Sequence, residues 1–235
     1  MLASHPLEFL SLTFRGLVPL HKEYRTRLRM TLFDWIGFHE KLMKKGQCRW
    51  MGVRADKNPL DAWIYQEILF EVRPEVVIEI GSYQGGSTLF LAHLLELIGD
   101  GFVISVDIDR SEYKVRHPRI IEVTGESSSS DVISRVADLC RGRRGLVIHD
   151  ADHLKEQVLK DLANYAPLVG VGSYFIVEDS VEDLLTPFED VGQFHDGPLA
   201  AIEEFLKENR QFEVDVDRER YILSNNPRGF LKRTK

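Results

Sequence analysis

The chain reads VVIEIGSYQGGST from Val76 to Thr88, a short apolar run that ends in a glycine-rich turn. β-Branched residues dominate the run, which is typical of a strand covered on both faces. Gly81, Gly85 and Gly86 lack side chains where the backbone would turn sharply and approach a ligand. The stretch therefore predicts a strand, a nucleotide-binding loop and a helix start, the beginning of an α/β fold.

An acidic residue, Asp107, follows the glycine loop after about twenty residues. The apolar run 102–106 ends in Asp107, which places a carboxylate at the end of the next predicted strand. An acid at this spacing is typical of a residue that accepts hydrogen bonds from ribose hydroxyls.

Three nucleotide cofactors compete for the loop. A phosphate-binding loop needs Lys where Ser87 stands, so a nucleoside triphosphate is disfavoured. The dinucleotide fingerprint needs a second glycine where Tyr83 stands, so NAD is disfavoured as well. Glu79, just before the glycines, and Asp107 instead suit S-adenosylmethionine, which carries an ammonium and a sulfonium rather than phosphates.

Several separate blocks carry a family resemblance. They are Trp50-Met51-Gly52, Asn58-Pro59, Tyr65-Gln66-Glu67, 79–87, Ser105-Val106-Asp107-Ile108-Asp109, 148–153, Tyr165-Ala166-Pro167-Leu168-Val169, Gly172-Ser173-Tyr174, Val177-Glu178-Asp179 and Gly229-Phe230-Leu231-Lys232-Arg233. With these blocks the chain resembles the cephalosporin hydroxylase and rhamnosyl O-methyltransferase family of class I S-adenosylmethionine-dependent methyltransferases. The resemblance runs from about Trp50 to the end, and the first forty-odd residues do not share it.

The resemblance implies a set of cofactor contacts, a metal site and a base. We expect the cofactor to contact Glu79, Gly81, Ser82, Tyr83, Gly85, Ser87, Asp107, Ile108, Glu126, Ser127 and Asp150. Asp150, Glu178 and Asp179 follow apolar strands, and three carboxylates without cysteine suit Mg²⁺. The metal would lower the pKa of a substrate hydroxyl. The resemblance assigns these three as metal ligands and His153 as the general base, a residue type whose usual pKa suits proton transfer at neutral pH.

Structural roles compete with some of these assignments. Asp152 or its neighbours could cap the helix predicted after them, and 127–130 could be a polar turn and N-cap. Glu79 could accept backbone N–H bonds in the glycine turn. Adjacent residues of a regular strand point to opposite faces, so Glu178 and Asp179 can share one ion only if the chain bends there. His93, His117 and His149 are expected to be structural or exposed.

The alternation of elements predicts a Rossmann-like class I methyltransferase fold, a mostly parallel seven-stranded sheet with helices on both faces. The expected strands are 76–80, 102–106, 119–123, 145–149, 173–178, 212–216 and 220–224, the last two an antiparallel pair. The expected helices are 60–72, 87–98, 131–140, 154–166 and 198–209. Ligands bind beyond the carboxyl ends of such strands, so Gly81, Asp107, Gly125, Asp150 and Glu178 should converge on one rim.

Composition limits the classes of protein. The chain has 235 residues, enough for one α/β core, and a net charge of −7, which argues against nucleic-acid binding. Its two cysteines, Cys48 and Cys140, favour reduced thiols in the cytoplasm. No signal peptide or membrane-spanning run is recognised, so a soluble protein without integral membrane contact is expected.

Two regions flank the predicted core. Residues 1–48 are expected to form a helical extension to the catalytic domain 49–235. The basic, apolar stretch 15–45 is expected to pack on that domain or on a second subunit of a homo-oligomer, although it could instead bind an anionic membrane surface. Residues 180–197, with Phe188, Phe194 and His195, are a candidate substrate lid.

These inferences predict a Mg²⁺-dependent O-methyltransferase that acts on a hydroxyl of a small molecule, such as a deoxysugar of a natural product. Two alternatives stay open at this stage. The chain could be a cofactor-binding accessory subunit of a cephalosporin-hydroxylase-type system, or an NAD-dependent oxidoreductase that tolerates Tyr83.

Overall fold

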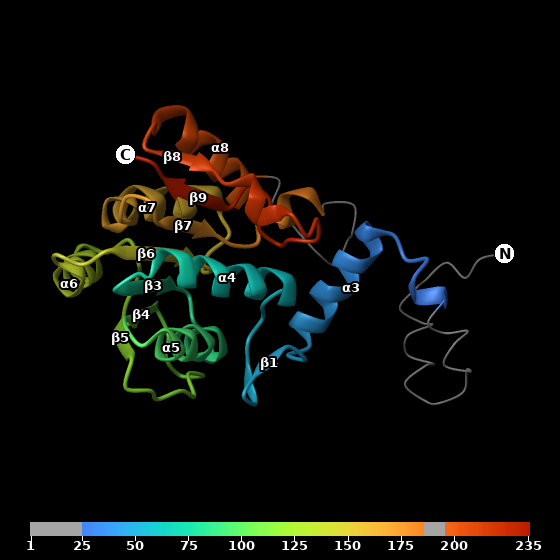
Figure 1. Cartoon of the computed structure of the whole chain (residues 1–235), viewed down its shortest axis with the longest axis horizontal. Helices are drawn as coiled ribbons and strands as arrows, with labels where there is room; N and C mark the ends of the chain where they lie inside the picture. Colours follow the sequence, from blue (N-terminus) through green and yellow to red (C-terminus); the bar gives the residue numbers. More distant parts are fainter. Residues whose placement is uncertain (1–24, 186–195) are drawn as a thin grey trace.

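A computed structural model describes residues 25–185 and 196–235 (Figure 1). The helices are α3 Leu32–Lys44, α4 Pro59–Val72, α5 Gly86–Ile98, α6 Ser130–Cys140, α7 Lys155–Tyr165 and α8 Pro198–Glu208. The main sheet contains β3 Val76–Ile80, β4 Phe102–Asp107, β5 Ile120–Thr124, β6 Gly145–His149, β7 Tyr174–Val177, β8 Phe212–Val214 and β9 Phe230–Arg233. Three 3₁₀ helices, η1 Ala166–Leu168, η2 Ser180–Leu184 and η3 Val216–Glu219, and a short hairpin of β1 Arg49–Trp50 and β2 Val53–Arg54 complete the elements.

The seven strands lie in the order β5-β4-β3-β6-β7-β9-β8. The first five pair in parallel, whereas β9 pairs antiparallel with both β7 and β8. The order reverses between β3 and β6, and such a switch point leaves a crevice at the carboxyl ends of the strands. The predicted fold class is confirmed.

Helices cover both faces of this sheet. Residues of α4 and α5 pack on one face, against Val77 of β3 and Val103 of β4. Residues of α6, α7 and α8 pack on the other face, against Ile78 of β3 and Val147 of β6. The alternation of side chains along each central strand thus fills two apolar layers, which explains why these strands read as continuous apolar runs.

Helix α4 shows how local sequence sets an element's start. The side-chain oxygen of Asn58 accepts the N–H of Leu60 at 3.0 Å, and Pro59 occupies the first turn, where its missing N–H costs nothing. The helix ends at Val72, and its C-cap Arg73 adopts a left-handed conformation with φ of 47°. Lys57 immediately precedes the N-cap Asn58, so the start of α4 also fixes the position of Lys57.

One predicted strand is wrong. Residues 220–224 do not form the last strand, because the chain turns through η3 and Ile222 is 75% exposed with φ of +68°. The strand that pairs with β8 is β9, where Phe230 and Leu231 are fully buried. Short-range alternation favoured 220–224, but burial against β7 selects the later segment.

Two expected regions are only partly covered. Helix α3 lies within the predicted helical stretch 15–45, while the rest of that stretch before residue 25 lies outside the described residues. Phe188, Phe194 and His195 of the predicted lid also lie outside them. Among the described helices, none is both long and apolar enough to cross a bilayer.

Candidate functional site

The glycine loop between β3 and α5 fits closely against the rest of the rim. Gly81 has φ of +86°, and a Cβ placed on it would lie 1.8 Å from the backbone oxygen of Asp150. A Cβ on Gly86 would lie 2.0 Å from the backbone oxygen of Arg54. Both glycines are therefore required because other backbone segments approach the loop closely, whereas the sequence had assigned this closeness to a ligand.

Asp107 holds the loop from the adjacent strand. Its Oδ2 accepts the backbone N–H groups of Ser82 at 2.8 Å and Tyr83 at 2.9 Å, and its Oδ1 accepts the N–H of Asp109 at 3.1 Å. Burial opposes ionisation of this carboxyl, but the N–H donors outweigh burial and lower its pKa. Asp107 is thus an ionised acceptor that also shapes the loop.

Arg110 is a second support that the sequence did not reveal. Its guanidinium donates to Ser82 Oγ at 2.7 Å and to Ser105 Oγ at 2.9 Å, and it also reaches the backbone oxygen of Val123 at 3.0 Å. These bonds tie the loop to β4 and β5. The loop is therefore held in shape by Asp107 at the end of β4 and by Arg110, which follows that strand.

Glu79 occupies a different place from the other predicted cofactor residues. Its carboxylate is fully buried on β3 and accepts a hydrogen bond from Thr88 Oγ1 at the start of α5. Burial raises its pKa to about 7, although Lys57 and the hydroxyls of Ser87 and Thr88 favour the ionised form. The acid lies beneath the loop, where it supports the helix start.

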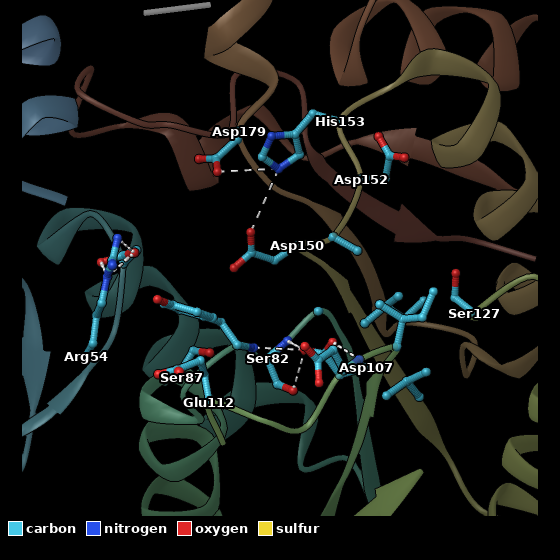
Figure 2. Close-up of a pocket in the computed structure, with 18 of the residues that line it drawn as sticks. Arg54, Ser82, Ser87, Asp107, Glu112, Ser127, Asp150, Asp152, His153 and Asp179 are labelled. Carbon is cyan, nitrogen blue, oxygen red and sulfur yellow. Dashed lines mark hydrogen bonds and ion pairs between the residues drawn. The ribbon is translucent and has the colours of Figure 1, made fainter. Parts of the chain in front are cut away.

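A cavity of about 650 Å³ opens over the carboxyl ends of the strands (Figure 2). Of the predicted site residues, those that line it are Gly81, Ser82, Tyr83, Ser87, Asp107, Ile108, Glu126, Ser127, Asp150, His153 and Asp179. Gly125 of the expected rim lines it as well, whereas Glu79, Gly85 and Glu178 do not. Most of the predicted cofactor loop and acidic positions therefore face one common space.

Asp150, His153 and Asp179 meet at one side of this cavity (Figure 2). His153 Nε2 lies 3.9 Å from Asp150 Oδ1 and 3.6 Å from Asp179 Oδ2, and its Nδ1 lies 3.2 Å from Glu182 Oε2. One ligand atom from each of the first three residues lies within 4.8 Å of the others. Two carboxylates and an imidazole at this spacing fit a divalent cation.

The charge around His153 controls its protonation. Burial lowers its pKa, but Glu182, Asp179 and Asp150 outweigh burial and raise the pKa to about 10. The imidazolium is therefore the stable form at neutral pH when no cation shares the carboxylates. Nε2 faces the two acids of the cavity, while Nδ1 is oriented by Glu182.

The chain bends between Glu178 and Asp179, as sharing of one ion would require. Asp179 has φ of +54°, a left-handed conformation, and is the N-cap of η2. Its backbone N–H donates to Asn226 Oδ1 at 3.0 Å, which fixes the bend. The bend lets the two carboxylates leave the strand in directions that a regular strand would not permit.

Glu178 lies behind the cavity wall. Its Oε2 accepts from Lys57 Nζ at 2.6 Å, and its Oε1 accepts from the hydroxyl of Tyr65 at 2.8 Å. Lys57 also pairs with Asp150 Oδ2. Glu178 is thus joined to Asp150 through an ammonium, and it belongs to the site without lining the cavity.

Asn225 and Asn226 are buried residues of the C-terminal segment that sequence reasoning missed. Asn225 Nδ2 donates to Glu40 Oε1 at 2.6 Å and approaches Asp179 Oδ1 at 3.4 Å. Asn226 Nδ2 donates to the hydroxyl of Tyr65 at 2.9 Å. The one available signal was a pair of adjacent asparagines just before the Gly229 block, and it does not name partners so distant in sequence.

Helix α3 supplies part of the cavity wall. Glu40, Met43 and Lys44 line it, and Arg54 donates to the backbone oxygen of Met43 at 3.1 Å. Burial, followed by the charge of Asp179, raises the pKa of Glu40 to about 8. The end of the predicted helical extension therefore contributes to the site.

Residues 127–129 form a turn before α6, but neither this helix nor α7 has a side-chain cap hydrogen bond, so the capping roles considered for these residues are not found. Asp152 Oδ1 accepts the N–H of Leu154 at 2.9 Å just before α7. Ser127 Oγ donates to Asp161 at 2.9 Å, and that carboxylate also pairs with the buried His149 at 3.1 Å. Asp152 and Ser127 thus face the cavity and stabilise its frame at the same time.

A second histidine group lies away from this cavity. His93 and His117 approach Glu96 closely enough to suggest a metal site. However, His93 Nδ1 accepts the indole N–H of Trp50 at 3.0 Å, and His117 Nδ1 accepts the N–H of Arg119 at 3.2 Å. Each neutral ring then carries its proton on Nε2, so the pair does not offer two imidazole lone pairs to an ion.

Known proteins match both the sequence and the fold. The family model described as rhamnosyl O-methyltransferase/CmcI matches residues 43–234. Rhamnosyl O-methyltransferase of Mycobacterium leprae strain TN is 37% identical over 193 residues, which cover 78% of this chain and 82% of the relative. The Mycobacterium bovis BCG protein of the same name is 31% identical over 193 residues, or 78% and 77% of the two chains. A solved CmcI structure with Mg and S-adenosylmethionine superposes with a TM-score of 0.63 at 24% identity, covering 81% of this chain and 78% of that one.

Proposed function

The chain belongs to the rhamnosyl O-methyltransferase/CmcI family, and from this membership we propose that it transfers the methyl group of S-adenosylmethionine to a sugar hydroxyl. The named relatives make a rhamnose-type deoxysugar the proposed acceptor. The single observation that carries the proposal is the cavity in which the glycine loop and Asp107 face the group Asp150, His153 and Asp179.

The loop side of the cavity suits the methyl donor. Asp107 keeps its carboxylate ionised and still has acceptor capacity beyond its loop bonds, so it can accept ribose hydroxyls. Ile108 is largely exposed within the cavity and provides an apolar surface for an adenine ring. Glu126 and Ser127 lie on the same wall and are the proposed contacts of the adenine edge.

The acidic side suits a divalent cation and the acceptor. Asp150 and Asp179 are the proposed ligands that face the cavity. Glu178 is the third proposed ligand, and one of its oxygens also accepts a hydrogen bond from Lys57. A bound Mg²⁺ would supply positive charge that lowers the pKa of a sugar hydroxyl. The donor set of hard oxygens fits this ion.

His153 is proposed to take the hydroxyl proton at Nε2. Glu182 orients the ring through Nδ1, and the carboxylates around it stabilise the imidazolium that proton transfer produces. In the cation-free protein this imidazolium already exists, so His153 is not a base in that state. Cation charge beside Asp150 and Asp179 would lower its pKa, which agrees with a metal requirement.

Asp150→Ala separates an enzyme from an accessory subunit. Calorimetry of S-adenosylmethionine binding, combined with assay of S-adenosylhomocysteine formed from a rhamnoside panel with Mg²⁺, provides the test. The enzyme proposal predicts saturable binding and turnover in the wild type, and a loss of at least about hundredfold in turnover for the variant. Cofactor binding without turnover on any hydroxylated acceptor would instead favour the accessory role.

The wider setting of the protein is also a proposal. We expect a cytoplasmic homo-oligomer in which residues 1–48 extend the methyltransferase domain 49–235, within a natural-product or glycoconjugate pathway. Helix α3 supports a link between the extension and catalysis, because its last turns line the cavity. Light scattering of the full chain and of a chain that begins at residue 49 would measure the contribution of the extension to assembly.

A further inference from the structure

Lys57 is a buried lysine at the centre of the acidic side of the site. It lies just before α4, and its side chain is only 9% exposed. Its ammonium pairs with Asp150 Oδ2 and lies 2.6 Å from Glu178 Oε2. Both partners are proposed metal ligands, so one protein cation already occupies the place between them.

Strand geometry explains why these acids gather on the α4 side. Ile148 of β6 and Ile176 of β7 are register partners and pack in the apolar layer beneath α4. Asp150 and Glu178 each follow two residues later, so the period of two along a strand returns them to the same face. Glu79 on β3 lies on this face too, because it is two residues after Val77 of that layer.

The ammonium is surrounded by carboxylates rather than by solvent, since it contacts Asp150 and Glu178 and only 9% of its side chain is exposed. The hydroxyl of Tyr65 engages the second oxygen of Glu178 at 2.8 Å. Both oxygens of Glu178 therefore already accept bonds inside the protein, so a cation bound there would share this carboxylate with Lys57 and Tyr65.

We propose that Lys57 is an internal counter-ion that competes with the divalent cation for Asp150 and Glu178. The proposal rests on the proposed metal-dependent function. Without a cation, Lys57 compensates carboxylates that would otherwise repel one another in a buried place. When a cation binds, the ammonium is a like charge close to it and weakens its binding. Lys57 thus maintains the ligand geometry of the empty site and makes the metal exchangeable.

The test compares metal affinity and metal-free stability in three variants of the full chain. Lys57→Met removes the charge, Lys57→Arg keeps it, and Tyr65→Phe removes the second bond to Glu178 without changing any charge. Calorimetry with Mg²⁺ and electron paramagnetic resonance with Mn²⁺ measure affinity, and thermal unfolding in chelator measures stability. Should Lys57→Met not fold without metal, Lys57→Gln replaces it, because its amide can bond a carboxylate while the charge is still lost.

We expect Lys57→Met to bind Mg²⁺ and Mn²⁺ at least about tenfold more tightly than the wild type and to unfold at a lower temperature in chelator. Lys57→Arg should stay within a few fold of wild-type affinity. Equal or weaker metal binding by a folded Lys57→Met protein overturns the counter-ion role. Absence of any metal binding by the wild type would instead count against the metal in the proposed function, so the two failures are distinguishable.

Discussion

Gly81 lies directly against the backbone carbonyl of Asp150, so closely that a Cβ on Gly81 would overlap that oxygen at 1.8 Å. The contact joins the loop after β3 to the first acid after β6. Asp150 also donates its N–H to the backbone oxygen of Ile80 at 2.7 Å. The proposed S-adenosylmethionine site and the proposed metal site therefore share one backbone junction. A substitution that disrupts this junction should impair both sites.

Gly81→Ala tests this junction. The substitution should abolish saturable S-adenosylmethionine binding and lower the melting temperature, because the methyl group forces the two loops apart at a φ of +86°. Gly172→Ala is the matched control: its φ is +81°, but no atom lies within 4 Å of the added Cβ. That control should lose only about 1 kcal/mol of stability from the left-handed backbone and keep full binding. Calorimetry and thermal unfolding measure both effects, and equal behaviour of the two variants would disprove the shared junction.

Asp107→Asn tests the acid that shapes the loop. The neutral amide keeps one acceptor oxygen but loses the charge that attracts the N–H groups of Ser82 and Tyr83. Because hydrogen bonds to a charged group contribute about 1.5–3 kcal/mol, affinity for S-adenosylmethionine should fall at least about tenfold. Asp100→Asn is the control, since Asp100 accepts the N–H of the adjacent Gly101 and does not line the cavity. An unchanged affinity in Asp107→Asn would show that the carboxylate does not contribute to the donor site.

The raised pKa of His153 predicts a pH-dependent stability in the metal-free protein. The folded pKa is about 10, above the ordinary value of 6.5 that applies to the unfolded chain. Folding therefore favours the protonated ring, so its stabilising effect is complete below pH 6.5 and is lost as the pH rises toward 10. Urea unfolding in chelator should show that the stability difference between wild type and His153→Gln shrinks over this window. In a Glu182→Gln background the stabilising effect of the protonated His153 should be lost at lower pH. A stability difference between wild type and His153→Gln that grew with pH would contradict the raised pKa of His153.

At Glu40, in contrast to His153, substitution by a neutral residue should stabilise the protein at high pH. Burial raises its pKa to about 8 from an ordinary value of 4.5, so folding favours the protonated acid and stability falls as the pH rises between these values. Glu40→Gln keeps an oxygen for Asn225 and removes the charge. The variant should be more stable than the wild type at pH 9 and similar to it at pH 4.5, as measured by urea unfolding in chelator. Glu203→Gln, at an exposed position, serves as the control. A Glu40→Gln protein that is less stable than the wild type at pH 9 would contradict the raised pKa of Glu40.

The sequence was most informative where neighbouring residues decide the structure. The strands at Val76–Ile80 and Gly145–His149 have the predicted bounds, because continuous apolar runs bounded by glycine or acid leave little choice. Asp107 and Asp150 were predictable as rim residues because the carboxyl ends of parallel strands meet at one edge, whereas Glu178, expected there too, does not line the cavity and its neighbour Asp179 does.

Tertiary contacts decided what the sequence could not. Lys57 meets Glu178 and Asn225 meets Glu40 across more than a hundred residues, and no local pattern indicates such a partner. The strand predicted at 220–224 failed for the same reason, because pairing with β7 buries Phe230 and Leu231, although the predicted segment is at least as apolar. Long-range burial, rather than periodicity, selected these positions.

Transfer of a deuterated methyl group tests the central claim most directly. The protein is incubated with methyl-deuterated S-adenosylmethionine and a rhamnoside, with Mg²⁺ or with excess chelator, and the glycoside is analysed by mass spectrometry. The account predicts a deuteromethyl ether on one sugar hydroxyl, formed with Mg²⁺ and absent with chelator. A labelled product that forms equally well in chelator would contradict the role assigned to Asp150, Glu178 and Asp179, and no labelled product from a panel of deoxysugars would contradict the proposed acceptor class.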